Sequence, residues 1–215
     1  MKHLHRTLAL IAALGAALAV QAGTYVRPIV GYFAFDNSDF KNKTGFGLAV
    51  GSTLDSGGNH EVELEIDQVA WEAVWINPGP RAIGSTFPMG DGHLIPVLVG
   101  YRYRTGTPDS PLRFYVGANL GATYVSGDIL QSAPSPLDHP WTGSVSSWRA
   151  TLGGAIGVEI RLTHHVNLDV GYRYRAVHGP TAKLRRPDTP ADVWYSHSLG
   201  NLSTSVFTLG LNCSF

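Results

Sequence analysis

Apolar and polar residues alternate along most of the chain after residue 23, and this period of two is the strongest structural signal in the sequence. The segment 112–125 shows it best: apolar side chains from Leu112 to Tyr124 fall on one face, and the other face carries Arg113 and Asn119. Successive side chains of a strand point to opposite faces, so the pattern predicts β-strands. Eight such segments of about nine to fourteen residues are predicted, and they start near Thr24, Thr44, Glu61, His93, Leu112, Ser147, Val166 and Ser203.

The third segment departs from this regularity in its second half. It alternates cleanly as far as Asp67, but around 68–71 the phase drifts, as it would at a β-bulge. Gly and Pro interrupt every window that is long enough for a helix, so no convincing helical periodicity is found. The sequence therefore predicts an all-β chain, with a bulge as one interpretation of the third segment.

The composition of the polar faces bears on the choice between a soluble barrel and a membrane barrel. A soluble β-fold packs its apolar face inward, whereas an outer-membrane barrel turns its apolar face to lipid and its polar face to the interior. Here the polar faces are rich in glycine, such as Gly117, Gly121 and Gly157, and their cations are Arg rather than Lys. Small residues suit a narrow interior, and Arg forms planar, two-bond pairs with carboxylates in confined sites. These features favour the membrane barrel, with a soluble barrel as the alternative.

The lengths of the connections favour the same architecture. Outer-membrane barrels have short periplasmic turns and longer extracellular loops. We therefore predict that residues 23–215 form a closed eight-stranded antiparallel up-and-down transmembrane β-barrel of this kind. The predicted turns are 55–60, 105–111 and 163–165, and the predicted loops are 72–92, 126–146 and 177–202, with 36–43 as a short exception among the loops.

The first 22 residues have the pattern of an export signal. Lys2 and Arg6 lie close to the N-terminus, and an apolar run follows from Leu8 to Val20. Small residues flank a predicted cleavage site before Gly23. This order is typical of a secretory signal peptide. The run of 13 apolar residues is too short for a spanning helix, which needs about 20. We predict a cleaved signal peptide over residues 1–22.

Composition and charge exclude several classes of protein. Charged residues make up 15% of the chain, and its 16 basic and 16 acidic residues leave no formal net charge. Nucleic-acid-binding domains carry a basic excess, so no nucleic-acid partner is expected. Cys213 is the single cysteine, which excludes an intramolecular disulfide and a cysteine-rich zinc site. The histidines lack metal-ligand spacing and no nucleotide motif occurs, so neither a metal nor a cofactor is expected.

Three segments carry a family resemblance: 112–125 (LRFYVGANLGATYV), 155–175 (AIGVEIRLTHHVNLDVGYRYR) and 206–215 (VFTLGLNCSF). They resemble strands of the small outer-membrane β-barrel family, which includes the opacity-type surface proteins and the transmembrane domain of outer-membrane protein A. The terminal Phe215 resembles the signal that the barrel-assembly machinery reads, although the two residues before it differ from the usual ones. The resemblance implies the cell outer membrane of a Gram-negative bacterium, with lipid, lipopolysaccharide and the assembly machinery as partners.

Charged residues on the inward face are nearly balanced. Glu63 and Glu65 of the third strand lie beside Arg102 and Arg104 of the fourth, and opposite charges on neighbouring strands attract each other. Unpaired buried carboxylates would be costly, and side chains fill the interior of an eight-stranded barrel. We therefore predict a plugged lumen, with a narrow channel for small solutes as the alternative. The predicted lumen network consists of Arg27, Glu61, Glu63, Glu65, Asp67, Arg102, Arg104, Arg113, Arg149, Glu159, Arg161, Asp169, Arg173 and Arg175.

The long loops are the predicted contact surface, because a rigid scaffold presents such segments outward. Their aromatic residues could anchor an extracellular protein or glycan. Trp and Tyr also gather at membrane interfaces, an alternative that suits Trp71 and Trp148 best. We expect an envelope-structural or surface-interaction, adhesin-like role. The candidate loop contacts are Trp75, Phe87, Trp141, Trp194 and Tyr195.

A lipid A-modifying enzyme is the third hypothesis. Some eight-stranded outer-membrane barrels do this chemistry with a His and a Ser near the outer rim, and the chain carries His178, His197 and Ser198, with Asp188 and Asp192 as candidate acids. A nucleophile and its base must lie within hydrogen-bond reach, but adjacent residues of a strand point to opposite faces. The protein is therefore expected not to be an enzyme.

Overall fold

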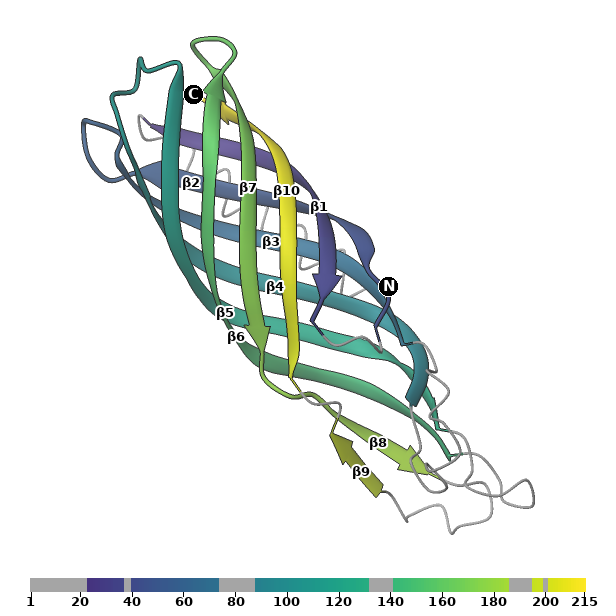
Figure 1. Cartoon of the computed structure of the whole chain (residues 1–215). Coiled ribbons are helices and arrows are strands. Elements are labelled where there is room, and N and C mark those ends of the chain that lie inside the picture. Colours follow the sequence, from purple (N-terminus) through teal and green to yellow (C-terminus); the bar gives the residue numbers. More distant parts are fainter. Residues whose placement is uncertain (1–22, 37–39, 74–87, 132–140, 186–194, 199–200) are drawn as a thin grey trace.

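The chain forms a closed antiparallel β-barrel in the computed structural model (Figure 1). Eight strands make the wall, and the pairing of β1 (Thr24–Phe35) with β10 (Leu202–Ser214) closes it. The described part of the chain contains no helix that is long and apolar enough to cross a membrane. The predicted signal peptide lies outside that part. The structure describes residues 23–36, 40–73, 88–131, 141–185, 195–198 and 201–215.

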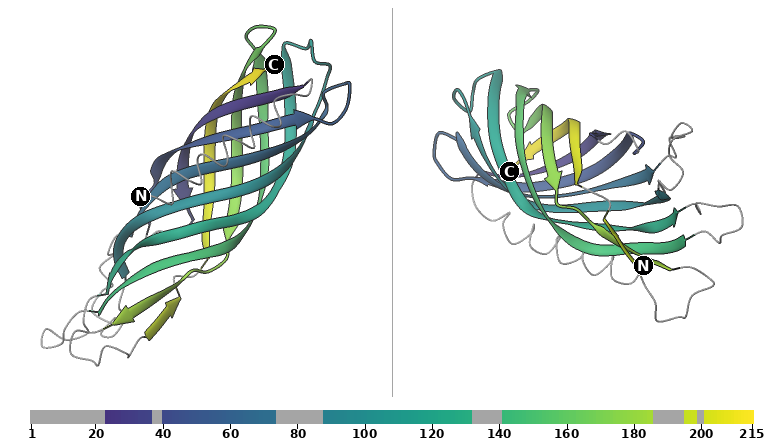
Figure 2. Two further views of the ribbon diagram at one scale, coloured as in Figure 1. Left: turned by 180° about the vertical axis from the view of Figure 1, so that it is seen from behind. Right: turned by 60° about the horizontal axis from the view of Figure 1, so that its bottom comes forward.

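The six strands between β1 and β10 in the ring follow one another in chain order, each pairing with the next. Where all eight strands pair, the backbone groups of the wall are thus satisfied between strands without a free edge, which is the condition for a β-structure in lipid. Figure 2 shows the steep tilt of these strands from behind and with the bottom of Figure 1 turned forward. The strands are β2 (Lys43–Thr53), β3 (His60–Ala73), β4 (Pro88–Arg104), β5 (Leu112–Gln131), β6 (Trp141–Arg161) and β7 (Val166–Val177).

The two ends of the barrel differ. One end, called here the turn end and drawn at the top of Figure 1, carries the short connections 54–59, 105–111 and 162–165. Gly58 and Gly106 adopt positive φ angles of 60° and 81° in two of these turns, a conformation that glycine adopts at little cost. β1 begins and β10 ends at the turn end, as the even number of strands requires. The opposite end is called the loop end.

The loop end contains more strand than the sequence predicted. β5 and β6 are 20 and 21 residues long and occupy much of the predicted loop 126–146. In the predicted loop 177–202, β8 (Thr181–Arg185) pairs with the beginning of β6, and β9 (Tyr195–Ser198) pairs with β8. This extension exists because β7 ends at Val177, opposite Thr151, and so leaves the first ten residues of β6 without β7 as a partner.

The turn-end half of the wall turns its apolar side chains outward. On β5, Phe114, Val116 and Leu120 are 58%, 55% and 63% exposed. Leu152 and Ile156 of β6 are equally exposed. The alternate positions of the same strands point into the lumen and include buried charged residues. This distribution is the reverse of a soluble barrel and matches the predicted inverted arrangement.

The polarity of the two faces reverses near the loop end, while the strands continue without a break. On β5 the outward side chains change from Leu120 to Asp128, and the inward ones change from Arg113 to Val125 and Ile129. The ring of Tyr124 marks the boundary together with that of Trp148, 5.4 Å away. Beyond this boundary, polar side chains face outward around an apolar interior, as in a water-soluble barrel.

This reversal corrects the prediction of a bulge in β3. Ile66 pairs with Val97 and Val69 pairs with Leu94, so two residues separate the pairs on each strand and neither strand has an extra residue. Pro96, which lacks an N–H, is one of the two β4 residues between these pairs. The side chains of β3 keep alternating between the inward and the outward face. The apparent drift in phase arises because the inward face changes from charged to apolar near the loop end.

Trp71 lies inside the barrel rather than at the membrane interface, so that prediction is wrong for this residue. Its side chain is 2% exposed, its Nε1 donates to the carbonyl of Ser126 over 3.1 Å, and its indole packs against Phe40 and over Gly92 and Gly127. Trp148, by contrast, is 57% exposed on the outer wall. The apolar core around Trp71 consists of Phe33, Phe35, Phe40, Val69, Ala73, Leu94, Val125, Ile129, Val145, Val177, Ala182, Leu184, Leu202 and Val206.

Candidate functional site

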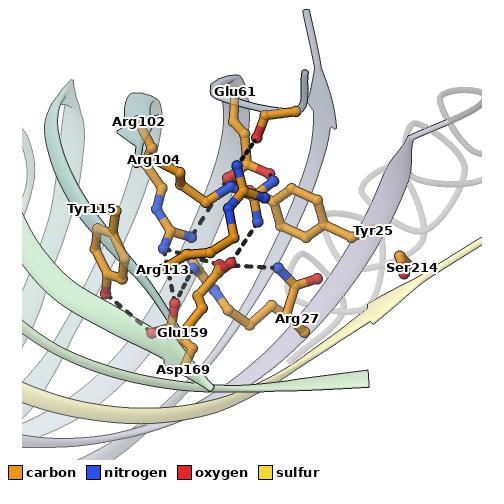
Figure 3. A network of polar contacts seen from close by, with 12 residues as sticks. Tyr25, Arg27, Glu61, Arg102, Arg104, Arg113, Tyr115, Glu159, Asp169 and Ser214 are labelled. Carbon is orange, nitrogen blue, oxygen red and sulfur yellow. Dashed lines mark hydrogen bonds and ion pairs between the residues drawn. The ribbon is translucent and has the colours of Figure 1, made fainter. Parts of the chain in front are cut away.

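On the turn-end side of this apolar core, the lumen is filled by charged side chains (Figure 3). Glycines on the inward face make room for them. The ring of Tyr115 lies where a Cβ at Gly157 or Gly171 would stand, and Tyr25 covers Gly51 in the same way. Each of these two rings therefore leans over a glycine directly opposite it on the neighbouring strand. This small-and-large packing explains why the inward face is rich in glycine.

Twelve of the fourteen predicted network residues are buried in the lumen, each 7% exposed or less. Six of them are arginines and six are carboxylates, so the formal charges of the group balance. Opposite charges in such a confined interior attract strongly, and this attraction offsets the cost of removing them from water. The twelve are Arg27, Glu61, Glu63, Glu65, Asp67, Arg102, Arg104, Arg113, Glu159, Asp169, Arg173 and Arg175.

The layer nearest the turn end is organised by two arginines of β4. Arg104 bridges Glu61 of β3 and Glu159 of β6, with 2.5 Å between its Nη1 and the Glu159 Oε2. Arg102 Nη2 lies 2.9 Å from Asp169 Oδ2 on β7 and 3.3 Å from Glu159 Oε1. Both guanidinium groups thus join strands on opposite sides of the lumen.

Tyrosines support the same layer from within. The guanidinium carbon of Arg102 lies 3.7 Å from the centre of the Tyr115 ring, which is close stacking, and the Tyr115 hydroxyl donates to Asp169 over 3.1 Å. The Tyr25 hydroxyl donates to Glu63 over 2.9 Å. Sequence reasoning missed the role of these two tyrosines, although their inward positions on charged strands were a usable signal.

Arg27 of β1 connects this layer with a second one closer to the loop end. Its Nη2 lies 2.6 Å from Glu63 Oε2 and 3.7 Å from Glu65 Oε2, and its Nη1 lies 2.9 Å from Asp169 Oδ2. The carboxylates therefore come from β3 and from β7, on either side of β1 in the ring.

The second layer pairs β3 with β7 across the lumen. Glu65 forms ion pairs with both Arg173 and Arg175, and Arg175 Nη2 also lies 2.6 Å from Asp67 Oδ2. Arg175 is the one ion-pair partner of Asp67 among the described residues. The guanidinium carbon of Arg175 lies 5.7 Å from the centre of the Phe33 ring, so this side chain borders the apolar core.

The expected partnership of Glu65 with the β4 arginines is therefore wrong. The residue opposite Glu65 on β4 is Leu98, whereas Arg102 is opposite Glu61. An eight-stranded lumen is narrow enough for long side chains to meet across it, so facing strands supply partners as readily as neighbouring ones.

Three predicted arginines have other partners. Arg113 is buried, but its Nη2 donates to the Gly58 carbonyl over 2.6 Å and so fastens a turn. Arg161 pairs with the exposed Asp109 at the turn end, 2.9 Å away. Arg149 is half-buried and donates to the Ser147 hydroxyl over 3.2 Å. Arg149 and Arg161 are thus not part of the buried network. Arg161 lies at the turn end of the lumen, and Arg149 lies on β6 toward the loop end.

The arginines of the network have more N–H groups than the carboxylates satisfy. Buried Nε atoms of Arg27, Arg102 and Arg175 have no hydrogen-bond partner in the protein, and Asn119 Oδ1 is unpaired as well. Buried groups of this kind are normally completed by water. No cluster of three or more metal-binding side chains occurs among residues 23–215 where the structure describes them.

At the loop end, the outer surface carries a small ion-pair cluster. The ammonium groups of Lys41 and Lys43 hydrogen-bond the carboxylate of Glu72, and these bonds lower its pKa to about 2. Phe40 forms an isolated bridge with Ala73 beside this cluster. The contacts fasten the segment before β2 to the end of β3, outside the apolar belt.

The loop aromatics that were predicted as contacts lie largely beyond the structure's description. Trp75, Phe87 and Trp194 fall outside the described residues, and Trp141 and Tyr195 are described by their backbone alone as the first residues of β6 and β9. The same holds for the side chains of His197 and Ser198, and for Asp188 and Asp192. Phe215 follows β10, is 72% exposed and donates its N–H to the Thr24 carbonyl over 3.0 Å.

Comparison with known proteins places these features in a family. A family model described as the outer membrane protein beta-barrel domain matches residues 7–215. An uncharacterized protein of Brucella abortus (strain 2308) is 36% identical over 75 residues, which are 34% of this chain and 26% of that protein. The chain thus spans about a quarter of the length of the curated relatives it matches.

Solved structures of small outer-membrane barrels share the fold. Neisserial surface protein A superimposes with a TM-score of 0.54 at 15% identity, covering 90% of this chain and 98% of its own. A major outer membrane protein from Thermus thermophilus gives 0.55 at 11% identity, with 90% and 100% coverage. The outer membrane protein OprG from Pseudomonas aeruginosa gives 0.52 at 16% identity, with 91% and 97% coverage.

Proposed function

Because the chain belongs to the outer membrane protein beta-barrel domain family, we propose that it is a sealed barrel with an envelope-structural or surface-interaction role, exerted by its surface rather than by its interior. It is a protein of the Gram-negative outer membrane, where the apolar belt of its wall contacts lipid. Family members share this architecture while the function of each depends on its own sites.

The packing of the lumen is the observation that supports a sealed barrel. The balanced ion pairs fill the turn-end half, and the apolar core around Trp71 fills the loop-end half. A hydrated ion would have to displace both, although water alone could complete the unpaired N–H groups. The second candidate function, a narrow channel for small solutes, has in its favour only those unpaired polar groups.

We expect the refolded barrel to give no steady single-channel conductance in planar lipid bilayers. The physical reason is the absence of a continuous polar path past the apolar core in the described lumen. A porin inserted by the same procedure serves as the control for membrane quality. Reproducible conductance steps from the wild-type barrel, well above the bilayer leak, would contradict the sealed lumen and favour the channel.

The second part of the proposal concerns orientation and partners. We place the loop end outside the cell, because long connections are extracellular in this architecture. The loops 74–87, 132–140 and 186–194 would then meet lipopolysaccharide and any extracellular protein or glycan ligand. Phe215 at the end of β10 would serve the assembly machinery during insertion.

Cysteine labelling of whole cells tests this orientation. In a Cys213→Ser background, a membrane-impermeant maleimide should modify Ser135→Cys and leave Pro108→Cys unmodified until the cells are broken. Pro108 is exposed in the turn 105–111, so its protection would arise from the membrane rather than from burial. Labelling of position 108 but not 135 on intact cells would reverse the orientation.

A further inference from the structure

An imidazole side chain lies on the apolar outer wall at the turn end. His60, the first residue of β3, points outward at the level where most neighbouring strands present apolar side chains. An imidazole at the edge of the hydrocarbon is costly unless each of its nitrogens finds a hydrogen-bond partner. Outward-facing residues near the turn end of other strands include Val26, Leu112, Ile160, Leu168 and Leu211.

Two tyrosines of β4 flank His60 and form an outward cluster with it. His60 is opposite Tyr103 in the strand pairing, and their rings lie 5.3 Å apart. The His60 Nδ1 lies 2.5 Å from the Tyr101 hydroxyl, a hydrogen bond. Tyr101 and Tyr103 are 44% and 41% exposed, so the cluster is open to the surrounding membrane.

The cluster has hydrogen-bond donors that are free to bind a ligand. If Tyr101 donates to Nδ1 of His60, then the imidazole Nε2 carries a proton and is a free donor. If Nδ1 donates instead, the Tyr101 hydroxyl keeps its own proton for another acceptor. The Tyr103 hydroxyl has no hydrogen-bond partner among the described residues. In every tautomer, therefore, two donors face the membrane interface.

We propose that His60, Tyr101 and Tyr103 bind the phosphodiester of a membrane phospholipid. A phosphate supplies several strong acceptors at the depth where the apolar belt ends, and hydrogen bonds to an anion are stronger than those to water. The acyl chains would lie along Val62, which is opposite Tyr101, and Val116, which is opposite Tyr103; these side chains are 38% and 55% exposed. This inference rests on the proposed orientation, which puts the turn end in the inner, phospholipid leaflet.

The test measures lipid retained by the folded barrel in native mass spectrometry, in a detergent without phosphate. Wild-type barrel titrated with phosphatidylglycerol should retain one lipid, while His60→Leu and Tyr103→Phe should each bind it about tenfold more weakly. Tyr174→Phe is the matched control, because Tyr174 is equally exposed at 42% on β7 but lies apart from His60 in the ring. The control should bind like wild type, and heat-modifiable migration on a gel verifies that each variant is folded.

Two further arms identify the source of the phosphate. Diacylglycerol, which lacks the phosphate, should bind equally and weakly to wild type and variants. Inorganic phosphate should fail to displace the lipid, because it gains nothing from the apolar wall. Unchanged retention in both variants, or equal binding of diacylglycerol and phosphatidylglycerol to wild type, would overturn the site. Displacement by inorganic phosphate would overturn its assignment to a lipid. Conductance of the wild-type barrel would contradict the sealed lumen without affecting any of these results.

Discussion

Replacing Arg175 with methionine should destabilise the folded barrel by about 3–5 kcal/mol, the usual cost of removing one partner from a buried ion pair. The reason is specific to its contacts: Asp67 loses the one ion-pair partner that the described lumen gives it, while Glu65 keeps Arg27 and Arg173. Urea unfolding in lipid vesicles, followed by tryptophan fluorescence, measures this loss. Water that reaches Asp67 through the lumen would bring the destabilisation closer to about 3 kcal/mol.

A second substitution distinguishes the free energy lost with the ion pair from the free energy lost with packing. Asp67→Leu in the Arg175→Met background removes the stranded carboxylate, so the double variant should be more stable than the sum of the two single losses predicts. We expect a coupling of about 1–3 kcal/mol between the two sites. Strictly additive losses would mean that the two side chains do not interact. Lys41→Met serves as the exposed control, and its stability should change little because its pair with Glu72 lies in solvent.

Placing arginine at Leu120 should cost about 2–4 kcal/mol of folding free energy in a bilayer, because this position lies near the middle of the apolar belt. Leu120 is 63% exposed on the outer face of β5. The same change at Leu112, at the turn-end edge, should cost much less because the arginine can reach the interface. Refolding from urea into vesicles, with heat-modifiable migration as the readout, ranks these variants.

The reversal of polarity near Tyr124 adds a sharper control to this series. Ser126 is only six residues beyond Leu120 on the same outward face, yet it lies past the Tyr124 and Trp148 boundary. Ser126→Arg should therefore leave the stability nearly unchanged. A large loss at Ser126 would move the membrane boundary toward the loop end. Folding of the wild-type chain to a monodisperse protein in plain buffer would contradict a lipid-facing wall altogether.

The local sequence determined the strands and the direction of their faces. A period of two is a property of neighbouring residues, so the alternation from Leu112 to Tyr124 predicts both the strand and its outward side without knowledge of any partner. The preference for Gly and Arg on the opposite face likewise indicated a narrow polar lumen. These local features sufficed to predict a closed membrane barrel and to nominate the twelve buried charges.

Tertiary structure alone decided which charges meet and where each face changes its surroundings. Glu65 pairs with Arg173 and Arg175 because the closed ring sets β7 within reach across the lumen, a relation that depends on register around all eight strands. The position of Trp71 was misjudged for a related reason. The change of polarity over 68–71 was interpreted as a drift in phase, whereas the alternation continues through Trp71 and directs it inward. Whether an inward face meets charges or an apolar core depends on how far each strand extends beyond the lipid. The length of strand beyond the lipid depends on the pairing of β5, β6 and β8 and on the steep tilt of the wall. Neither can be derived from a single segment of sequence.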